Sequence, residues 1–371
     1  EGERANEWRF LFSSALYHRR ILSSIRSIRT FEERNKKKGV APYLLLLLLT
    51  TVLWGIGFVV TEQLTQNNVP VFMLFAIQFA IGAFCLAWFA FFGKKAERKP
   101  PSAGEAINGL LLGLLLGAAL VLKHFGLDSY SQGTDKSYFF SSAFVLFVPV
   151  LVCVFEKRWA LKELIDGLIA LTGLALFYNM FHKSDFFFSL FDGLSLMGGI
   201  AFAFYYYLLG RYANRFDTAR WVFYQLATVA VVCSAFTLIF EMKYMSEIKN
   251  GMEVAFGLIY LGVFCTGLAY FILVLAQKRL PSPSVSLVVG GQSVFAFLFA
   301  WAMGYVALES ASTVVGTVII IVAALSSLAV RPEKFYLSFG RIFRIAKYSE
   351  EKTCEKNSVE DVKEKDSASD G

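Results

Sequence analysis

Residues 42–61 read PYLLLLLLTTVLWGIGFVVT, a stretch of 20 residues that contains no Asp, Glu, Lys or Arg. An α-helix needs about 20 apolar residues to cross the hydrocarbon core of a bilayer. The stretch therefore predicts a transmembrane helix. Nine further apolar blocks of similar length follow, separated by short charged connectors. They occupy residues 71–92, 107–122, 138–155, 164–181, 190–209, 221–240, 254–275, 285–304 and 313–330.

The overall composition agrees with this pattern. The chain of 371 residues is 56% hydrophobic and only 18% charged, with a mean hydropathy of +0.54. Soluble domains carry about 25% charged residues, which they need to cover their surface. A cytosolic enzyme, a DNA-binding domain and a disulfide-stapled secreted module are therefore excluded. We expect an all-α polytopic membrane protein in contact with the lipid bilayer.

The connectors between the blocks differ in basic charge. One set of connectors, those that follow the second, fourth, sixth and eighth blocks, holds twelve basic residues: Lys94, Lys95, Arg98, Lys99, Lys157, Arg158, Lys162, Arg211, Arg215, Arg220, Lys278 and Arg279. The other set holds five: Lys123, Lys136, Lys183, Lys243 and Lys249. Because Lys and Arg concentrate in cytoplasmic loops, this alternation predicts ten transmembrane helices with both termini in the cytoplasm.

The chain divides into four parts. Residues 1–41 form a basic cytoplasmic arm, 42–181 and 182–330 form two halves of five helices each, and 331–371 form a charged, largely disordered cytoplasmic tail. The arm holds most of the net charge of +7. Its pattern fits a helix on an anionic membrane surface, and a solvated arm is an equal alternative. We favour the plasma membrane as the location.

Five helices per half place the second half upside down relative to the first, as in transporters built from inverted repeats. Two residues support this division. Gln78 in the second block recurs as Gln225 in the seventh, within FMLFAIQFAIGAF and WVFYQLATVAVV respectively. The sequence thus predicts two inverted five-helix repeats.

Three segments carry a family resemblance. Residues 44–64, 125–176 and 257–320 resemble the two EamA-type repeats of the drug/metabolite transporter superfamily, and the likeness extends over residues 42–330. The motifs that carry it are WG at 54–55, Pro149 in the fourth block, Glu156, Lys157 and Arg158 in the turn after it, and Gly167 at the start of the fifth block. The resemblance implies a ten-helix transporter.

The chain departs from the family pattern at polar positions. Gln78 stands where many members carry an Arg, Gln292 and Ser293 stand where Glu-Pro is frequent, and Tyr305 stands near a frequent acid. These losses leave the expected fold unchanged. They remove the basis for a charge-based transport mechanism like that of relatives.

Polar groups inside membrane spans are the first candidates for a substrate path, because they are unfavourable in hydrocarbon unless they face a cavity or a partner. Gln78, Gln225 and Gln292 are amides within otherwise apolar blocks. One interpretation is that Gln78 and Gln225 project into a central cavity and bind substrate. The alternative is hydrogen bonding between helices, at about 1 kcal/mol per bond.

Other side chains extend this candidate site. Ser141 could line the same cavity, although Ser in a membrane helix often bonds to its own turn. Trp54 and Tyr270 lie in the family-like segments and could form aromatic walls, with ordinary packing as the alternative. Pro149 removes a backbone hydrogen bond to Val145, and the resulting bend is a candidate gate.

Lys123 and His124 directly follow the third block, at the outer end of the predicted helix, and are candidates for an outer mouth. They could recognise an anion or respond to protons. The alternative is that Lys123 extends to the membrane interface without a role in transport.

The function best supported by the sequence is a secondary transporter of a small organic metabolite, working by alternating access and recognising mainly uncharged groups. The alternative is a membrane scaffold or receptor of the same architecture. No catalytic set, metal-ligand spacing or phosphate-binding loop is present, so we expect no enzyme activity, no cofactor, no metal and no nucleic-acid partner. Substrate, direction, ion coupling, organelle and oligomeric state stay open, with a homodimer as one alternative.

Overall fold

The computed structural model describes residues 41–92, 102–127, 134–157, 160–180, 188–305 and 311–329. Every regular element within these ranges is helical, as predicted. The predictions for the N-terminal arm and the C-terminal tail lie outside the described residues.

Helices occupy each predicted block. In the first half they are α2 (Ala41–Gln66), α3 (Val71–Ala87) with the π-helical turn η1 (Trp88–Phe92), α4 (Ala103–Phe125), α5 (Thr134–Ser142), α6 (Phe144–Phe155) and α7 (Leu161–Phe177). In the second half they are α8 (Leu190–Tyr212), α9 (Thr218–Phe236), η3 (Thr237–Glu241), η4 (Met242–Glu247), α10 (Gly251–Tyr260), η5 (Leu261–Leu268), α11 (Ala269–Gln277), α12 (Ser282–Gly290), α13 (Gln292–Ala302) and α14 (Ala311–Ala329).

Within the described ranges, eight helical segments are long and apolar enough to cross a membrane, and Ala311–Ser327 adds a shorter apolar helix. α7 differs from these because Lys162, Glu163 and Asp166 lie in its first two turns. The two outermost of these charges are paired, since the Lys162 ammonium donates to Asp166 and to the backbone carbonyl of Ser326 on α14. The chain is thus a multi-pass membrane protein, and the exact number of ten crossings stays a prediction.

The fourth and ninth predicted blocks are each divided into two helices. The first break lies at Ala143, between α5 and α6, and the second at Gly291, between α12 and α13. Pro149 lies in α6 and lacks the N–H that would bond to the carbonyl of Val145. The backbone of α7 lies against that carbonyl, because a Cβ added at Gly167 would be 3.0 Å from its oxygen.

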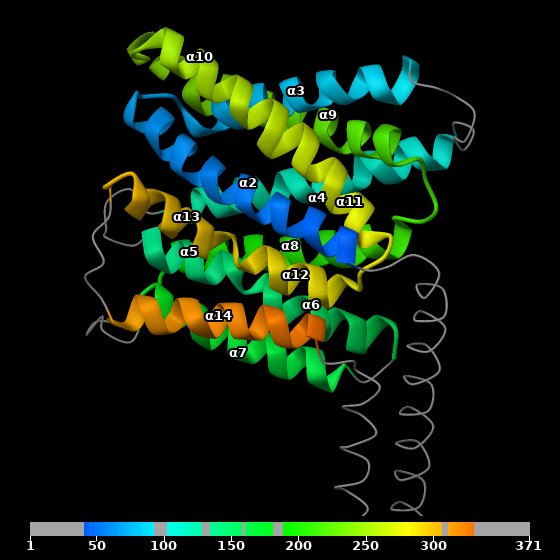
Figure 1. Ribbon diagram of the computed structural model, residues 1–371. Helices are drawn as coiled ribbons and strands as arrows, with labels where there is room; N and C mark the ends of the chain where they lie inside the picture. The colour runs from blue at the N-terminus through cyan, green and yellow to red at the C-terminus, as the bar shows by residue number, and fades with distance from the viewer. Residues whose placement is uncertain are drawn as a thin grey trace, which may run out of the picture. The chain divides into compact units, whose positions relative to one another are not determined.

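Helices of one half pack between helices of the other. α3 packs along α9, and α4 packs along both α8 and α9. Small residues permit this approach, since a Cβ at Gly113 of α4 would lie 2.6 Å from the carbonyl oxygen of Gln225 on α9. Figure 1 shows α7 and α14 side by side, and they meet at Gly173 and Gly316 in the same manner. The halves therefore form one interlocked core.

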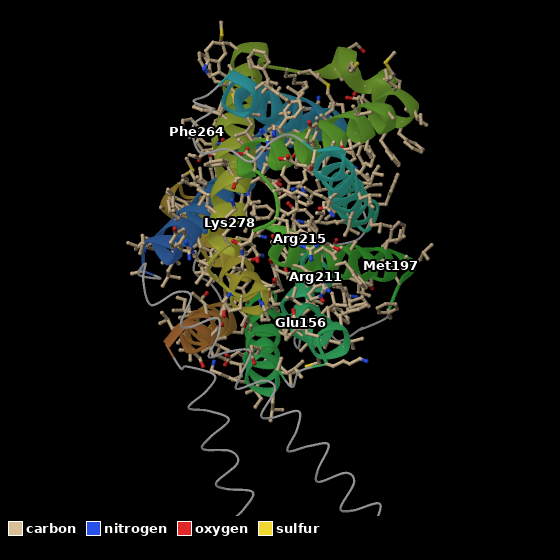
Figure 2. All side chains as sticks on the ribbon, turned by 90° about the vertical axis from the view of Figure 1, so that its right-hand side faces the viewer. Glu156, Met197, Arg211, Arg215, Phe264 and Lys278 are labelled. Carbon is tan, nitrogen blue, oxygen red and sulfur yellow. The ribbon has the colours of Figure 1, made fainter. Side chains whose placement is uncertain are left out.

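The two ends of the bundle differ in charge. We call the end at which α8 and α11 finish the basic end, and Figure 2 shows Arg211, Arg215 and Lys278 there. Close to this end, Arg220 at the start of α9 forms an ion pair of 3.2 Å with Glu105 at the start of α4. Both side chains are buried.

We call the opposite end, at which α2 and α4 finish and α3 and α5 begin, the mouth end. A carboxylate from the second half organises it. Glu241 accepts hydrogen bonds of 3.0 and 2.9 Å from the backbone N–H groups of Phe72 and Met73. These are unpaired donors of the first turn of α3, where a negative charge also favours the helix dipole.

Candidate functional site

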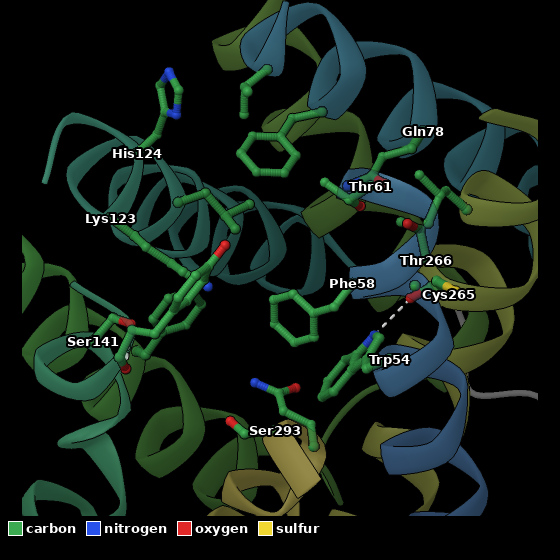
Figure 3. Close-up of a pocket in the computed structure, with 18 of the residues that line it drawn as sticks. Trp54, Phe58, Thr61, Gln78, Lys123, His124, Ser141, Cys265, Thr266 and Ser293 are labelled. Carbon is green, nitrogen blue, oxygen red and sulfur yellow. Dashed lines mark hydrogen bonds between the residues drawn. The ribbon is translucent and has the colours of Figure 1, made fainter. Parts of the chain in front are cut away.

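A cavity of about 340 Å³ lies between the two halves, and both contribute to its wall. It extends from Trp54 and Gln78, near the middle of their helices, to Glu62 and Thr65 at the mouth end. Glu62 is exposed, so the cavity is open at that end. Figure 3 shows side chains from several helices converging on this space.

Trp54 is held in place by an irregular helix. Leu261–Leu268 is π-helical, a form that displaces carbonyls from their usual hydrogen bonds. The indole Nε1 of Trp54 donates a hydrogen bond of 2.7 Å to one such carbonyl, that of Cys265. Its ring also meets the ring of Tyr270 edge-on, with centroids 5.4 Å apart. Trp54 and Tyr270 both line the cavity, and thus form a fixed aromatic wall.

Two of the three predicted amides line the cavity. Gln78 reaches it from α3 and Gln292 from the first residue of α13, just after the break at Gly291. Neither side chain makes a hydrogen bond within the described part of the chain. Each amide offers two donors and one acceptor, so both are available to a ligand or to water.

The third amide lies elsewhere. Gln225 is fully buried, is not part of the cavity wall, and accepts a hydrogen bond of 2.9 Å from the hydroxyl of Tyr205. The prediction that Gln225 faces the cavity together with Gln78 is therefore corrected. The physical reason is that this position lies on the face of α9 that packs against Gly113 of α4 and Tyr205 of α8, which leaves the side chain 0% exposed.

Ser141 lines the cavity, as predicted. It also donates a hydrogen bond of 3.1 Å to the carbonyl of Tyr138 in its own helical turn, which is the bonding that the alternative described. The cavity wall also contains a polar contact that the sequence did not reveal, a hydrogen bond of 2.9 Å from the Tyr178 hydroxyl to the Ser293 hydroxyl. Pro149, in contrast, is buried in α6 and does not line the cavity.

The sequence also did not reveal an aromatic row along one side of the cavity. Phe58 of α2 meets Tyr138 of α5 edge-on at 6.1 Å, and Tyr138 stacks on Tyr178 beside α7 at 6.3 Å. All three line the cavity. With aromatic residues at 16% of the chain, no pattern in the sequence distinguishes these rings from ordinary packing.

Lys123 lines the cavity instead of extending away from it. Its Nζ lies 5.0 Å from the ring centroids of both Phe58 and Tyr138. His124 also borders the cavity, but its ring packs edge-on against Phe72 with centroids 4.6 Å apart, and Figure 3 shows it pointing away from Lys123. Among the lining residues that the structure describes, only Glu62 and Lys123 are formally charged.

Metal binding finds no support in the part of the chain that the structure describes, which contains no group of three or more His, Cys, Asp or Glu residues that could hold an ion. The described lining residues thus supply two amides, hydroxyls, aromatic rings, the imidazole of His124, the thiol of Cys265, one ammonium and one carboxylate at the rim. Such a site can bind a small molecule without reacting with it.

Comparison with known proteins identifies the two halves. Residues 41–179 and 190–329 match the profile of the EamA-like transporter family. A solved structure described only as a crystal structure of a protein resembles the chain with a TM-score of 0.61 and 17% sequence identity, covering 77% of this chain and 97% of that one. This likeness concerns the fold alone. None of the curated proteins matches the chain.

Proposed function

Because the chain belongs to the EamA-like transporter family, we propose that it is a secondary transporter that moves a small organic metabolite across a membrane by alternating access. The cavity between the two repeats is the observation that carries this proposal. It lies where inverted-repeat transporters place their substrate, and one end of it is open.

The orientation follows from charge. We propose ten membrane crossings and a cytoplasmic position for the basic end, because positively charged connectors remain in the cytoplasm. The mouth end then faces away from the cytoplasm, and the structure corresponds to an outward-open state. The packed residues between the cavity and the basic end form the closed side, where the Gln277 amide donates to the carbonyl of Tyr206 at 3.4 Å.

We propose that Gln78 and Gln292 recognise hydrogen-bonding groups of the substrate while Trp54 and Tyr270 contact its apolar surface. One amide comes from each repeat, so a bound substrate touches both. Movement of one repeat relative to the other therefore changes the site, which couples binding to the exchange between states.

The breaks at Ala143 and Gly291 supply a route for this movement. They lie at the cavity, in the fourth helix of one repeat and the corresponding helix of the other. A helix in two segments can bend between them at low energy. In this proposal Pro149 does not contact the substrate. It acts on the movement of the helix, because it removes one backbone hydrogen bond from α6.

The test is transport by purified protein in liposomes. Vesicles are offered a broad mixture of metabolites, and the compounds taken up are identified by mass spectrometry. We expect uptake of a small set by wild-type protein and loss of that uptake in Gln78→Leu/Gln292→Leu. Gln66→Leu, an exposed amide near the mouth end that does not line the cavity, serves as the matched control.

The folding of each variant is checked by thermal melting. Absence of uptake of every compound by wild-type protein would contradict a transport function and favour a scaffold or receptor. Undiminished uptake by the double variant would instead remove the two amides from the site.

A further inference from the structure

Among the residues that the structure describes, the cavity wall holds one cation, Lys123, that has no charged partner. Within the residues that the structure describes, Lys123 forms no ion pair and donates no hydrogen bond. Its contacts with Phe58 and Tyr138 are cation–π interactions. An ammonium group has three N–H donors, and ring faces do not replace oxygen acceptors. The capacity of Lys123 to bind an anion is thus unused.

The position of Lys123 is also not that of a side chain extending toward water. Figure 3 shows it directed from α4 toward Phe58, which belongs to α2. Tyr138 approaches the same Nζ from α5. Two rings from two other helices therefore hold the ammonium at the cavity wall, where it meets whatever enters.

We infer that Lys123 binds the carboxylate of the substrate, and that the substrate is a monoanionic organic acid with an apolar or aromatic body. This inference rests on the proposed transport function and specifies its substrate class. It modifies the expectation of uncharged recognition: the inner part of the cavity is neutral, and the charged contact lies nearer the mouth end.

The charges of the lining residues favour a single negative charge on the ligand. Lys123 can neutralise one charge, and Glu62 at the rim would repel a second. Glu62 itself is exposed and accepts a hydrogen bond of 3.4 Å from the amide of Gln66, so water and a neighbour already satisfy it. A phosphate dianion would bring an unpaired charge into a largely apolar cavity, which is strongly unfavourable.

The residues of the cavity wall beyond Lys123 indicate the chemical character of the rest of the ligand. The row of rings formed by Phe58, Tyr138 and Tyr178 leads from the ammonium to Ser293, which is hydrogen-bonded to Tyr178. Gln292 lies next to it in sequence and also lines the cavity. A volume of about 340 Å³ is near the lower limit of ligand pockets, about 300 to 1,000 Å³. A compact acid with one ring or branched chain fits these limits.

The first experiment measures binding to purified full-length protein by thermal stabilisation. The probes are benzoate, phenylacetate and 3-phenylpropionate, each compared with its amide, which has the same shape without the charge. We expect at least one acid to bind wild-type protein about 10- to 100-fold more tightly than its amide, as a charged hydrogen bond predicts. Lys123→Gln should abolish the difference, and Lys123→Arg should retain it.

Lys243→Gln is the matched control. Lys243 also contacts a ring, with its Nζ 4.7 Å from the centroid of Tyr244, but it is exposed and does not line the cavity. This variant should bind the acids as wild-type protein does. Failure of wild-type protein to prefer any acid over its amide would overturn the inference without any variant, as would an unchanged preference in Lys123→Gln.

The second experiment separates the inference from the proposed function. The compounds that wild-type protein carries into liposomes from a metabolite mixture are sorted by charge. Uptake confined to neutral or cationic compounds would overturn the role of Lys123 and leave transport intact. Acid binding that depends on Lys123, in a protein that carries nothing, would support the anion site and contradict transport.

Discussion

The indole Nε1 of Trp54 and the carbonyl oxygen of Cys265 are joined by a hydrogen bond of 2.7 Å, between residues 211 positions apart in the chain. The bond connects the first helix of one repeat to the π-helical segment of the other. In return, the Cys265 thiol donates to the carbonyl of Leu53 at 3.1 Å. The indole and the thiol thus form two reciprocal hydrogen bonds between α2 and η5.

Replacement of Trp54 by Phe should therefore lower both stability and transport. The variant keeps an aromatic ring but leaves the carbonyl of Cys265 without this donor, at about 1 to 3 kcal/mol. Thermal melting of the purified protein and uptake in liposomes measure the two effects. Trp301→Phe, at an exposed position of α13, should change neither. Equal melting of Trp54→Phe and wild-type protein would contradict a structural role of this bond.

Tyr205 and Gln225 should behave as a coupled pair. Tyr205→Phe leaves the buried oxygen of Gln225 without its donor, while the nitrogen of the same amide already has no partner in the described residues. We expect a destabilisation of about 1 to 3 kcal/mol. The double variant Tyr205→Phe/Gln225→Met removes all the unpaired groups and should recover most of it. Additive effects in a double-mutant cycle would show that the bond contributes nothing.

Gly113→Ala should destabilise the contact between α4 and α9. The new Cβ would lie 2.6 Å from both the carbonyl oxygen of Gln225 and the Cβ of Thr228, so backbone must shift. Overpacking of this kind costs about 1 to 3 kcal/mol. Gly104→Ala in the same helix meets nothing within 4 Å and should leave stability unchanged or slightly raised. A lower melting temperature for the second variant than for the first would refute the packing argument.

Arg220→Met should strongly destabilise the basic end, because it leaves Glu105 as an uncompensated buried charge. Loss of one partner of a buried ion pair costs about 3 to 5 kcal/mol. The double variant Glu105→Leu/Arg220→Met should melt at a higher temperature than Arg220→Met alone. A double variant no more stable than the single one would mean that the pair contributes through packing and not through charge.

Much of the fold could be predicted, because the length of the apolar blocks and the distribution of charge among the connectors determine where the helices lie. Each apolar block is occupied by a helix, and basic residues predicted to share a side, such as Arg211 and Lys278, lie at one end. The breaks were less visible. No Pro or Gly marks Ala143, since Pro149 lies six residues later, and a pair such as Gly290 and Gly291 also occurs at Gly198 and Gly199 inside the unbroken α8.

The orientation of individual side chains at the site could not be predicted from the sequence. Gln78 and Gln225 both lie within apolar blocks, yet only Gln78 lines the cavity. A helix that is apolar all round carries no pattern that indicates which face meets lipid, protein or a cavity. For Lys123, the sequence left open whether the side chain faces the cavity or the membrane interface, and only the contacts with Phe58 and Tyr138 place it at the cavity wall.

The interlocking of the repeats has a consequence for biosynthesis. The Gly109 and Gly113 face of α4 packs against α9, and α4 ends at Phe125 whereas α9 begins at Thr218. At about 5 to 20 residues per second, the ribosome makes the partner helix roughly 5 to 20 s later. During that interval the nascent first half sits in the membrane with its packing face unfilled. A truncated product should therefore be recognised as incomplete and degraded, and the first repeat alone should not accumulate in cells.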